Sequence, residues 1–335
     1  MKTLNQLEYR TYEFVGANRA KVQLPEYKPG TLPLPEFAPL EGREYGLSKE
    51  MVDLHREATL YEAYHAQEAM ELGVTENRSF GNAIVTRDFV VEEGKHLHGY
   101  FSTEHDEGFR SHLNRIHVKK NGLAKLYFLN FDREDVQTFI SIAAVLEEGA
   151  KLDLYLYDMS DGDTYMNVRC YLDGAESLAN IQSIYLGKDE EKMDFQYDVL
   201  HQGKDSTSNL IVDGALMDDC RKTFKSRLDF LEGSGGSKGN EEEFAILLDD
   251  TARSISIPAL LSHEDDVEGN HAASCGHIDQ NLLFYIMNRG FTQAQAERLI
   301  IDAKFAPVID NINYVDQREA VYRRLDQIME DRYGK

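Results

Sequence analysis

The sequence predicts an all-β core between about residues 80 and 270, with helical regions before and after it. Short runs in this region end in an apolar residue, two or so polar residues and a glycine, 25 to 30 residues apart. Runs such as LDLYLYD (152–158) and IQSIYL (181–186) carry the aromatic and β-branched residues of strands. A fixed interval of this length is typical of a β-solenoid, and glycine suits its corner turns. An antiparallel β-sandwich with similarly spaced turns is the alternative. The six corner glycines are Gly94, Gly122, Gly149, Gly174, Gly203 and Gly233.

Composition limits the class of protein. The chain has 335 residues, of which 42% are hydrophobic and 28% charged, as expected of a globular protein. It has no run of about 18 apolar residues, and its N-terminus lacks the apolar stretch of a secretory signal. The net charge of −23 argues against nucleic acid or an anionic membrane as a partner. Cys170, Cys220 and Cys275 are odd in number and widely spaced, which indicates a reducing, cytoplasmic location rather than a disulfide framework.

The first 80 residues are expected to hold a linker and a helix. Five of the seven prolines fall between residues 25 and 39, and none lies between residues 40 and 257. The proline-rich stretch is therefore expected to be an extended, polyproline-like linker. Ser48 is a suitable N-cap and Gly73 a suitable C′ residue, so we expect a long helix between them. The amphipathic spacing of this helix comes from Leu54, Ala58, Tyr61 and Met70.

Three helices are predicted after residue 278. Asp279 can cap the first, which ends at Gly290. The TQAQ of residues 292–295 forms a capping box for the second, which we expect to stop before Pro307. The third spans about residues 316–332, with apolar residues on one face. The chain thus divides into an N-terminal linker and helical region, a β core and a C-terminal helical region. Their expected bounds are residues 1–80, 81–277 and 278–335.

Two short motifs point to enzyme classes without completing them. GSGGSKGN (233–240) is not a P-loop, because Lys238 is followed by glycine rather than Ser or Thr. His96 and His98 form an HxH pair, about 6.6 Å apart on one face of a strand, with Glu104 six residues later. This pair resembles the first motif of cupins, although the second motif, with its PxG, is missing. A cupin-like all-β metal-binding enzyme using His96 and His98 is therefore the alternative function.

The densest group of candidate ligands lies in HEDDVEGNHAASCGHIDQNLLFYIMNRG (263–290). Its VEG, ending at Gly269, resembles another corner turn. His271, Cys275 and His277 follow within nine residues of that glycine. Imidazole and thiolate are ligands that iron and iron–sulfur clusters accept, so this group is a candidate metal site. A chance grouping is the alternative.

The geometry of a strand limits what this group can do. In an extended segment His271 and Cys275 share a face but lie about 13 Å apart, and Glu268 points to the opposite face. The pair could bind one metal ion only if the chain turned at Ala272–Ala273.

Two adjoining segments carry a more specific pattern, IPALLSHEDDVEGNHAAS (257–274) and GHIDQNLLFYIMNRGFTQAQAERLIIDAKF (276–305). They resemble the acidic-His turn and the following helical signature of the SufB/SufD family, scaffold components of the SUF iron–sulfur cluster assembly system. FKSRLDFLEGSGGSKGNEEEFAILLDD (224–250) is also similar to this family. The likeness covers about residues 221–312 and is more specific than any single motif above.

The resemblance implies a right-handed parallel β-helix with helical terminal regions. It implies a scaffold rather than an enzyme, which builds nascent iron–sulfur clusters and transfers them. The implied partners are a second SufB/SufD-type subunit, a SufC-type ABC ATPase docked on the C-terminal helices, and a cysteine desulfurase or sulfur carrier. Iron and a transient cluster are the implied cofactors, and ATP acts through the ATPase alone. Because the chain is short for the family, a homodimer of one scaffold type is a further hypothesis beside a heterodimer.

The resemblance also suggests site residues. His271 matches the family's histidine at the subunit interface, which is implicated in cluster assembly. Gly269 stands where SufD-like chains often carry a cysteine, and Ala272 where SufB-like chains often carry a glutamate, so the usual ligand set is incomplete. His271 and Cys275 are the expected metal ligands. The candidates to complete the set beside His271 are Cys275, Glu268 and Cys220. For Cys220, in a β segment, a buried small hydrophobe is the alternative interpretation.

Overall fold

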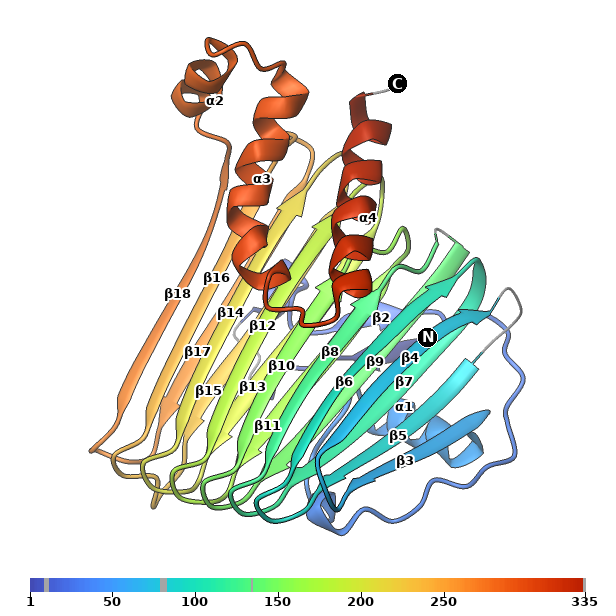
Figure 1. The fold of residues 1–335 in the computed structure, drawn as a ribbon, viewed down its shortest axis with the longest axis vertical. Helices are drawn as coiled ribbons and strands as arrows, with labels where there is room; N and C mark the ends of the chain where they lie inside the picture. The colour runs from blue at the N-terminus through green and yellow to red at the C-terminus, as the bar shows by residue number, and fades with distance from the viewer. Residues whose placement is uncertain (9–11, 79–82, 134, 334–335) are drawn as a thin grey trace.

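The computed structural model describes residues 1–8, 12–78, 83–133 and 135–333, and its main feature is a solenoid of two parallel eight-stranded sheets (Figure 1). One sheet holds the even-numbered strands and the other the odd-numbered strands. The even-numbered sheet consists of β4 (Met70–Arg78), β6 (His96–His105), β8 (Leu123–Asn130), β10 (Lys151–Asp158), β12 (Leu178–Gly187), β14 (Thr207–Leu216), β16 (Lys238–Leu247) and β18 (Glu268–His277). The odd-numbered sheet consists of β3 (Leu60–Ala66), β5 (Ala83–Val91), β7 (Glu107–Val118), β9 (Asp135–Leu146), β11 (Thr164–Leu172), β13 (Lys192–His201), β15 (Arg221–Phe230) and β17 (Arg253–Ser262).

The chain alternates between the two sheets, so each coil contributes one strand to each. Within a sheet every strand pairs in parallel with the strands of the neighbouring coils; Lys151 of β10, for example, lies between Leu123 of β8 and Leu178 of β12. This parallel pairing confirms the expected β-solenoid and excludes the antiparallel sandwich.

The six predicted corner glycines all lie where the chain passes from an odd-numbered strand to the next even-numbered strand. Gly94, Gly149 and Gly233 have φ angles of 65°, 63° and 98°, in the region that glycine adopts most easily. At the corner between β13 and β14 the positive φ of 55° falls on Asp205 instead. Gly203 is required there for another reason, because a Cβ atom on it would lie 2.1 Å from the carbonyl oxygen of Gly174.

The seventh expected corner, at Gly269, is wrong. Gly269 is the second residue of β18, and the turn precedes that strand at residues 263–267. Gly269 instead lies beside Gly239 of β16, where a Cβ atom would approach the side chain of Leu260 to 2.6 Å. Its small size therefore serves packing inside the solenoid rather than a turn.

The long helix expected between Ser48 and Gly73 is wrong beyond its first turns. Ser48 does cap a helix, accepting a hydrogen bond from the backbone NH of Met51, but α1 (Lys49–Leu54) has six residues and passes into the 3-10 helix η3 (His55–Glu57). β3 and β4 follow, with Gly73 inside β4. The apolar spacing of this segment fits a helix, but parallel pairing with β5 and β6 satisfies its backbone in strands.

The N-terminal segment covers the outer face of the odd-numbered sheet. It includes β1 (Lys2–Leu4), η1 (Glu13–Val15), β2 (Ala20–Val22) and η2 (Ala38–Leu40). Residues 23–37 have no helix or strand apart from one bridge at Leu32, in keeping with an extended linker. Leu40 and Phe37 pack against Val145 and Tyr171. The solenoid strands begin at Leu60, and the expected domain boundary between residues 80 and 81 lies outside the described residues.

The C-terminal helices α2 (Gln280–Met287), α3 (Gln293–Ile309) and α4 (Val315–Tyr333) confirm the predicted helical unit. Asp279 caps α2, and Thr292 and Gln295 form the predicted capping box of α3. The expectation that the second helix stops before Pro307 is wrong, since α3 continues through it. A proline inside a helix costs about 3 kcal/mol. Burial of Phe305 and of the neighbouring Val308 and Ile309, at about 1.5–3 kcal/mol each, outweighs that cost.

Helices α3 and α4 lie across the outer face of the even-numbered sheet, whereas α2 stands at its β18 end (Figure 1). Two tyrosines of the sheet donate hydrogen bonds to the helical unit: Tyr127 to the carbonyl of Asn311 at 2.7 Å, and Tyr157 to the carbonyl of Val308 at 2.8 Å. The helical unit is thus packed firmly onto the solenoid. None of the described helices has the length and apolar character needed to cross a membrane.

Candidate functional site

The strand that carries the predicted ligands forms a free edge of the even-numbered sheet. β18 pairs with β16 on one side, and no described strand pairs with its other side. All of its residues except Gly276 are exposed. His271 lies in register beside Glu241 of β16, which follows Leu210 and Ile181 of the main core. Because side chains alternate along a strand, His271, Ala273, Cys275 and His277 continue the inner face of the solenoid.

His271 and Cys275 share a face, as predicted, but are too far apart to bind one metal ion. β18 stays extended through Ala272 and Ala273, so their Cα atoms are about 13 Å apart. In the part of the chain that the structure describes, no group of three or more His, Cys, Asp or Glu side chains could hold a metal ion. In this conformation a single chain cannot bind one ion through both residues, as the strand geometry predicted. Their roles as metal ligands and in cluster assembly remain a prediction.

Glu268 is separated from this face. It begins β18 with the opposite orientation, as its even position requires, and forms an ion pair of 2.8 Å with Lys238. Both residues are exposed. Glu268 could join His271 only by leaving the face of the strand on which it lies.

Cys220 is buried in the turn between β14 and β15. It belongs to the main hydrophobic core, and a Cβ atom on Gly187 would lie 2.4 Å from its sulfur. Burial raises the pKa of the Cys220 thiol far above its ordinary value. Cys220 therefore acts as a small hydrophobic residue, and as placed it cannot complete a ligand set at the edge.

His96 and His98 lie on the outer face of β6, on either side of the buried Leu97. His98 is in register with Lys125, and burial together with Lys125 lowers the pKa of this histidine. Cupins are built from antiparallel strands, whereas both sheets here are parallel. The cupin-like alternative is therefore wrong.

A buried polar group that the sequence did not predict lies directly behind the free edge. Glu243 of β16 and Lys222 of β15 form an ion pair of 2.6 Å between the two sheets. Glu243 also accepts hydrogen bonds from Tyr185 at 3.2 Å and from Ser256 at 2.8 Å. Burial lowers the pKa of Lys222, while Glu243 and, more weakly, Cys275 oppose that effect. Cys275 thus belongs to the same electrostatic environment as this ion pair.

Glu241 is the second member of this group, and it is completely buried. Its Oε1 accepts a hydrogen bond from Ser226 on the opposite sheet, and its Oε2 has no hydrogen-bond partner among the described residues. Burial raises the pKa of Glu241 to about 7, although Ser226 partly opposes the shift. A carboxylate that neighbours His271 and lacks a counter-ion is therefore present under the edge.

One signal in the sequence could have identified Glu241. His271 lies 30 residues after it, within the range of the glycine spacing, so stacked coils would place the two side by side. The run EEEF (241–244) is one of many acidic stretches in a chain with 59 acidic residues, so its composition does not single out Glu241. Only the pairing register of the strands shows that Glu241 and Glu243 point inward and are buried, whereas Glu242 is exposed.

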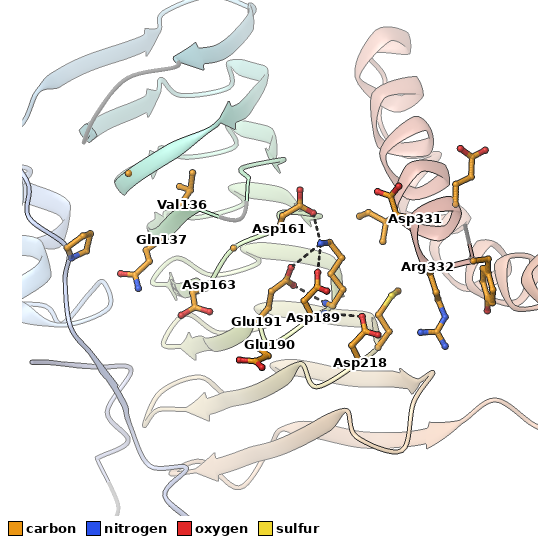
Figure 2. A pocket seen from close by; sticks show the side chains of 18 residues that line it. Val136, Gln137, Asp161, Asp163, Asp189, Glu190, Glu191, Asp218, Asp331 and Arg332 are labelled. Atoms are coloured by element: carbon orange, nitrogen blue, oxygen red, sulfur yellow. Dashed lines mark hydrogen bonds and ion pairs between the residues drawn. The ribbon is translucent and has the colours of Figure 1, made fainter. Parts of the chain in front are cut away.

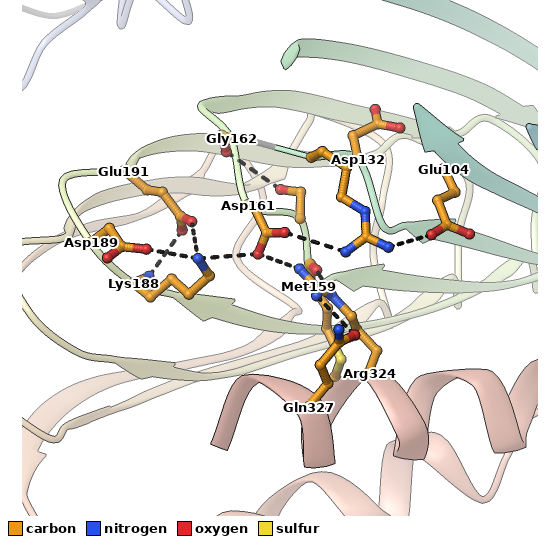
Figure 3. Close-up of polar contacts among 12 residues, drawn as sticks. Glu104, Asp132, Met159, Asp161, Gly162, Lys188, Asp189, Glu191, Arg324 and Gln327 are labelled. Atoms are coloured by element: carbon orange, nitrogen blue, oxygen red, sulfur yellow. Dashed lines mark hydrogen bonds and ion pairs between the residues drawn. The ribbon is translucent and has the colours of Figure 1, made fainter. Parts of the chain in front are cut away.

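The helical unit is tied to the solenoid by a charged network around Asp161 (Figure 3). Arg324 of α4 pairs with Asp161 and donates to the carbonyl of Met159 at 3.0 Å. Lys188 reaches the same carboxylate at 3.2 Å, and Arg133 at 3.7 Å. A movement of α4 would therefore be transmitted to the turns that connect the two sheets.

A groove of about 1230 Å³ lies beside this network, between the end of α4 and the turns of the solenoid (Figure 2). Its described lining is strongly acidic, but several carboxylates already have partners within the chain. Lys188 pairs with Asp189, and Asp218 accepts from the backbone NH of Asp189. Arg332 pairs with Asp249 nearby. We therefore assign the candidate site to the free edge rather than to this groove.

The fold places the chain among parallel β-solenoid proteins, with imidazole and thiol groups on a free edge and helices packed on one sheet. The comparison with known families is specific. Residues 55–304 match the sequence model of the family "SUF system FeS cluster assembly, SufBD core domain". The chain belongs to this SufBD family, whose role is iron–sulfur cluster assembly.

Individual relatives agree with this assignment. The chain is 30% identical over 181 residues to the iron–sulfur cluster assembly protein SufD of Bacillus subtilis, covering 54% of this chain and 40% of the relative. Two SufBD family proteins of Mycobacterium bovis are 21% identical over 202 residues and 27% identical over 165 residues. Those matches cover 60% and 47% of this chain, and 24% and 42% of the relatives. The chain thus matches less than half the length of each of these relatives.

Proposed function

We propose that the protein is a scaffold subunit that builds nascent iron–sulfur clusters together with a SufC-type ABC ATPase and transfers them to recipient proteins. The observation that carries the proposal is the family match over residues 55–304, which includes the free edge with His271. The subunit itself is a scaffold rather than an enzyme. ATP acts through the ATPase, and sulfur comes from a cysteine desulfurase or sulfur carrier.

The proposed docking site for the ATPase is an apolar patch on α2 and the beginning of α3. Large apolar side chains stand exposed there, and Phe284 is 67% exposed. A concentration of exposed apolar side chains on one short segment favours a protein contact. The members of this patch are Leu282, Phe284, Tyr285, Met287, Phe291 and Leu299.

The proposed second partner is another SufB/SufD-type subunit, either a second copy of this chain or a related one. The exposed edge strand β18 presents unpaired backbone groups, which in other proteins invite pairing with another chain. Pairing at this edge would place His271 and Cys275 at the interface of the two subunits. Closure of the ATPases would move the helices, and the contacts of α4 at Asp161 would pass that motion to the solenoid.

Iron and sulfide are the cargo of the proposed reaction. Imidazole and thiolate are ligands that iron and iron–sulfur clusters accept, and the inner face of β18 offers both. Exposure at the edge allows a cluster to be delivered after assembly. The buried ion pair of Lys222 and Glu243 lies behind these groups and links the two sheets of the solenoid.

An anaerobic affinity purification from the native host tests this proposal. We expect an ABC-type ATPase as the dominant bound protein, and acid-labile sulfide with iron in the purified complex. Recovery of the chain without an ATPase would contradict the proposal. Recovery of the ATPase complex without sulfide, even after incubation with a cysteine desulfurase, cysteine and iron, would show a structural subunit instead of an active scaffold.

A further inference from the structure

We propose that Glu241 and His271 bind the same ferrous ion on the inner face of the free edge, with one ligand from each of two neighbouring strands. The inference rests on the proposed function in one respect, namely that iron is the metal the protein handles. It replaces the pairing of His271 with Cys275, which the strand geometry does not permit.

The register of the edge supports this pairing. His271 of β18 lies directly opposite Glu241 of β16 in a parallel ladder. Neighbouring strands are about 4.8 Å apart, so two long side chains on the same face can reach one ion between them. Glu241 points inward, since Ser226 of the opposite sheet donates to its Oε1. His271 lies on the same face of the next strand out, at the solvent boundary.

The absence of a hydrogen-bond partner for Oε2 and of a counter-ion for Glu241, among the described residues, supports the same conclusion. Its side chain is fully buried, its Oε2 has no hydrogen-bond partner, and no described cation forms an ion pair with it. Two other buried carboxylates of the solenoid differ in this respect: Glu243 pairs with Lys222, and Asp194 pairs with Lys225 at 2.8 Å. A buried carboxyl group without a counter-ion is held in its neutral form unless a cation binds beside it. A metal ion held with His271 would supply the charge that the chain does not.

The chemistry of the pair suits iron as a cargo. Imidazole and carboxylate are ligands of non-haem ferrous iron, typically in sites that keep open positions. Two ligands from one chain leave positions for water, for sulfide or for groups of a facing subunit. Because the described residues hold no group of three or more ligands, the chain alone should bind the ion weakly enough to release it. Loading and release are both required of a scaffold.

Anaerobic calorimetric titration of the full chain with ferrous ion tests the inference, with Mössbauer spectra of the iron-57 form to identify nitrogen and oxygen ligands. We expect the wild-type protein to bind ferrous ion, and both Glu241→Gln and His271→Ala to weaken binding at least tenfold. The double variant should bind no more weakly than the weaker single variant if both residues hold one ion. Glu242→Gln is the matched control, because Glu242 lies on the same strand with its side chain exposed on the other face.

Glu241→Gln preserves the size of the side chain and an oxygen for Ser226, so the fold should be retained; Glu241→Asp provides a second variant with the charge kept and the reach shortened. Wild-type affinity in both Glu241→Gln and Glu241→Asp would overturn the inference. So would the absence of ferrous binding by the wild-type chain. The outcome is separable from that of the proposed function. Iron binding that depends on Glu241 without an ATPase partner or sulfide would leave the inference standing while the proposed function fails.

Discussion

Lys222 and Glu243 form an ion pair of 2.6 Å with both side chains fully buried, between the last coils of the solenoid. Glu243 lies on β16, next to the free edge strand β18, and Lys222 reaches it from the opposite sheet. The same carboxylate accepts from Tyr185 and Ser256. The interior of the solenoid is thus cross-linked by polar contacts directly behind the candidate site, where the hydrophobic core ends.

Removing one member of this pair should destabilise the protein strongly. Lys222→Met leaves the Glu243 carboxylate buried without its cation, and such a loss costs about 3–5 kcal/mol. Lys222→Met combined with Glu243→Leu removes both charges and should recover much of that stability. Urea unfolding followed by circular dichroism measures both effects. A loss below about 1 kcal/mol in the single variant would show that solvent reaches the pair.

The corner at Gly203 should tolerate no side chain. In Gly203→Ala the new Cβ atom would lie 2.1 Å from the carbonyl oxygen of Gly174, so the stacked turns must move apart. Overpacking of this kind costs about 1–3 kcal/mol. Gly235→Ala is the control, because no atom lies within 4 Å of its Cβ position and its φ lies outside the left-handed region. Equal urea midpoints for the two variants would contradict the stacking.

Arg324 should hold α4 on the solenoid. Arg324→Ala removes the ion pair with Asp161 and the hydrogen bond to the carbonyl of Met159, each a charge-assisted contact of about 1.5–3 kcal/mol. We expect faster amide hydrogen exchange in α4 with little change in the sheets. Arg323→Ala is the matched control, since Arg323 is the exposed neighbour. Unchanged exchange in α4 of the Arg324 variant would show that apolar packing alone fixes this helix.

Phe284 should be required for binding of the ATPase. Its ring is exposed on α2, so Phe284→Asp places a charge in the proposed docking patch without disturbing the core. We expect at least a tenfold loss of affinity for the copurified ATPase and an unchanged melting temperature. Val315→Asp is the control, as Val315 is another exposed apolar residue, at the start of α4. Equal retention of the ATPase by both variants would place its docking site elsewhere.

His271 should be required for cluster assembly and not for complex formation. His271→Ala removes the imidazole at the edge, so iron and sulfide should no longer accumulate on the complex in an anaerobic reconstitution, while the ATPase still copurifies. His263→Ala is the control, because His263 is exposed in the turn before β18. Normal cluster formation in the His271 variant would remove this residue from the site.

The elements that the sequence predicted correctly depend on local chemistry. The glycine interval predicted the solenoid because each corner needs a positive φ or a close approach, as at Gly94 and Gly203. Asp279 and the Thr292–Gln295 box predicted the starts of two helices, because caps satisfy backbone groups within a few residues. The specific pattern around His271 predicted the family that the match over residues 55–304 then showed.

Contacts between distant segments decided the rest. The residues after Leu54 have an apolar spacing that suits a helix, but pairing with β5 and β6 makes them strands. α3 continues through Pro307 because burial of Phe305 outweighs the cost of a proline inside a helix. The sequence alone does not show whether Cys220, Cys275 and Glu241 are buried or exposed, or which residues lie beside them. Parallel stacking buries the first, exposes the second and places the third beside His271, because register between coils is set by long-range packing rather than by neighbours along the chain.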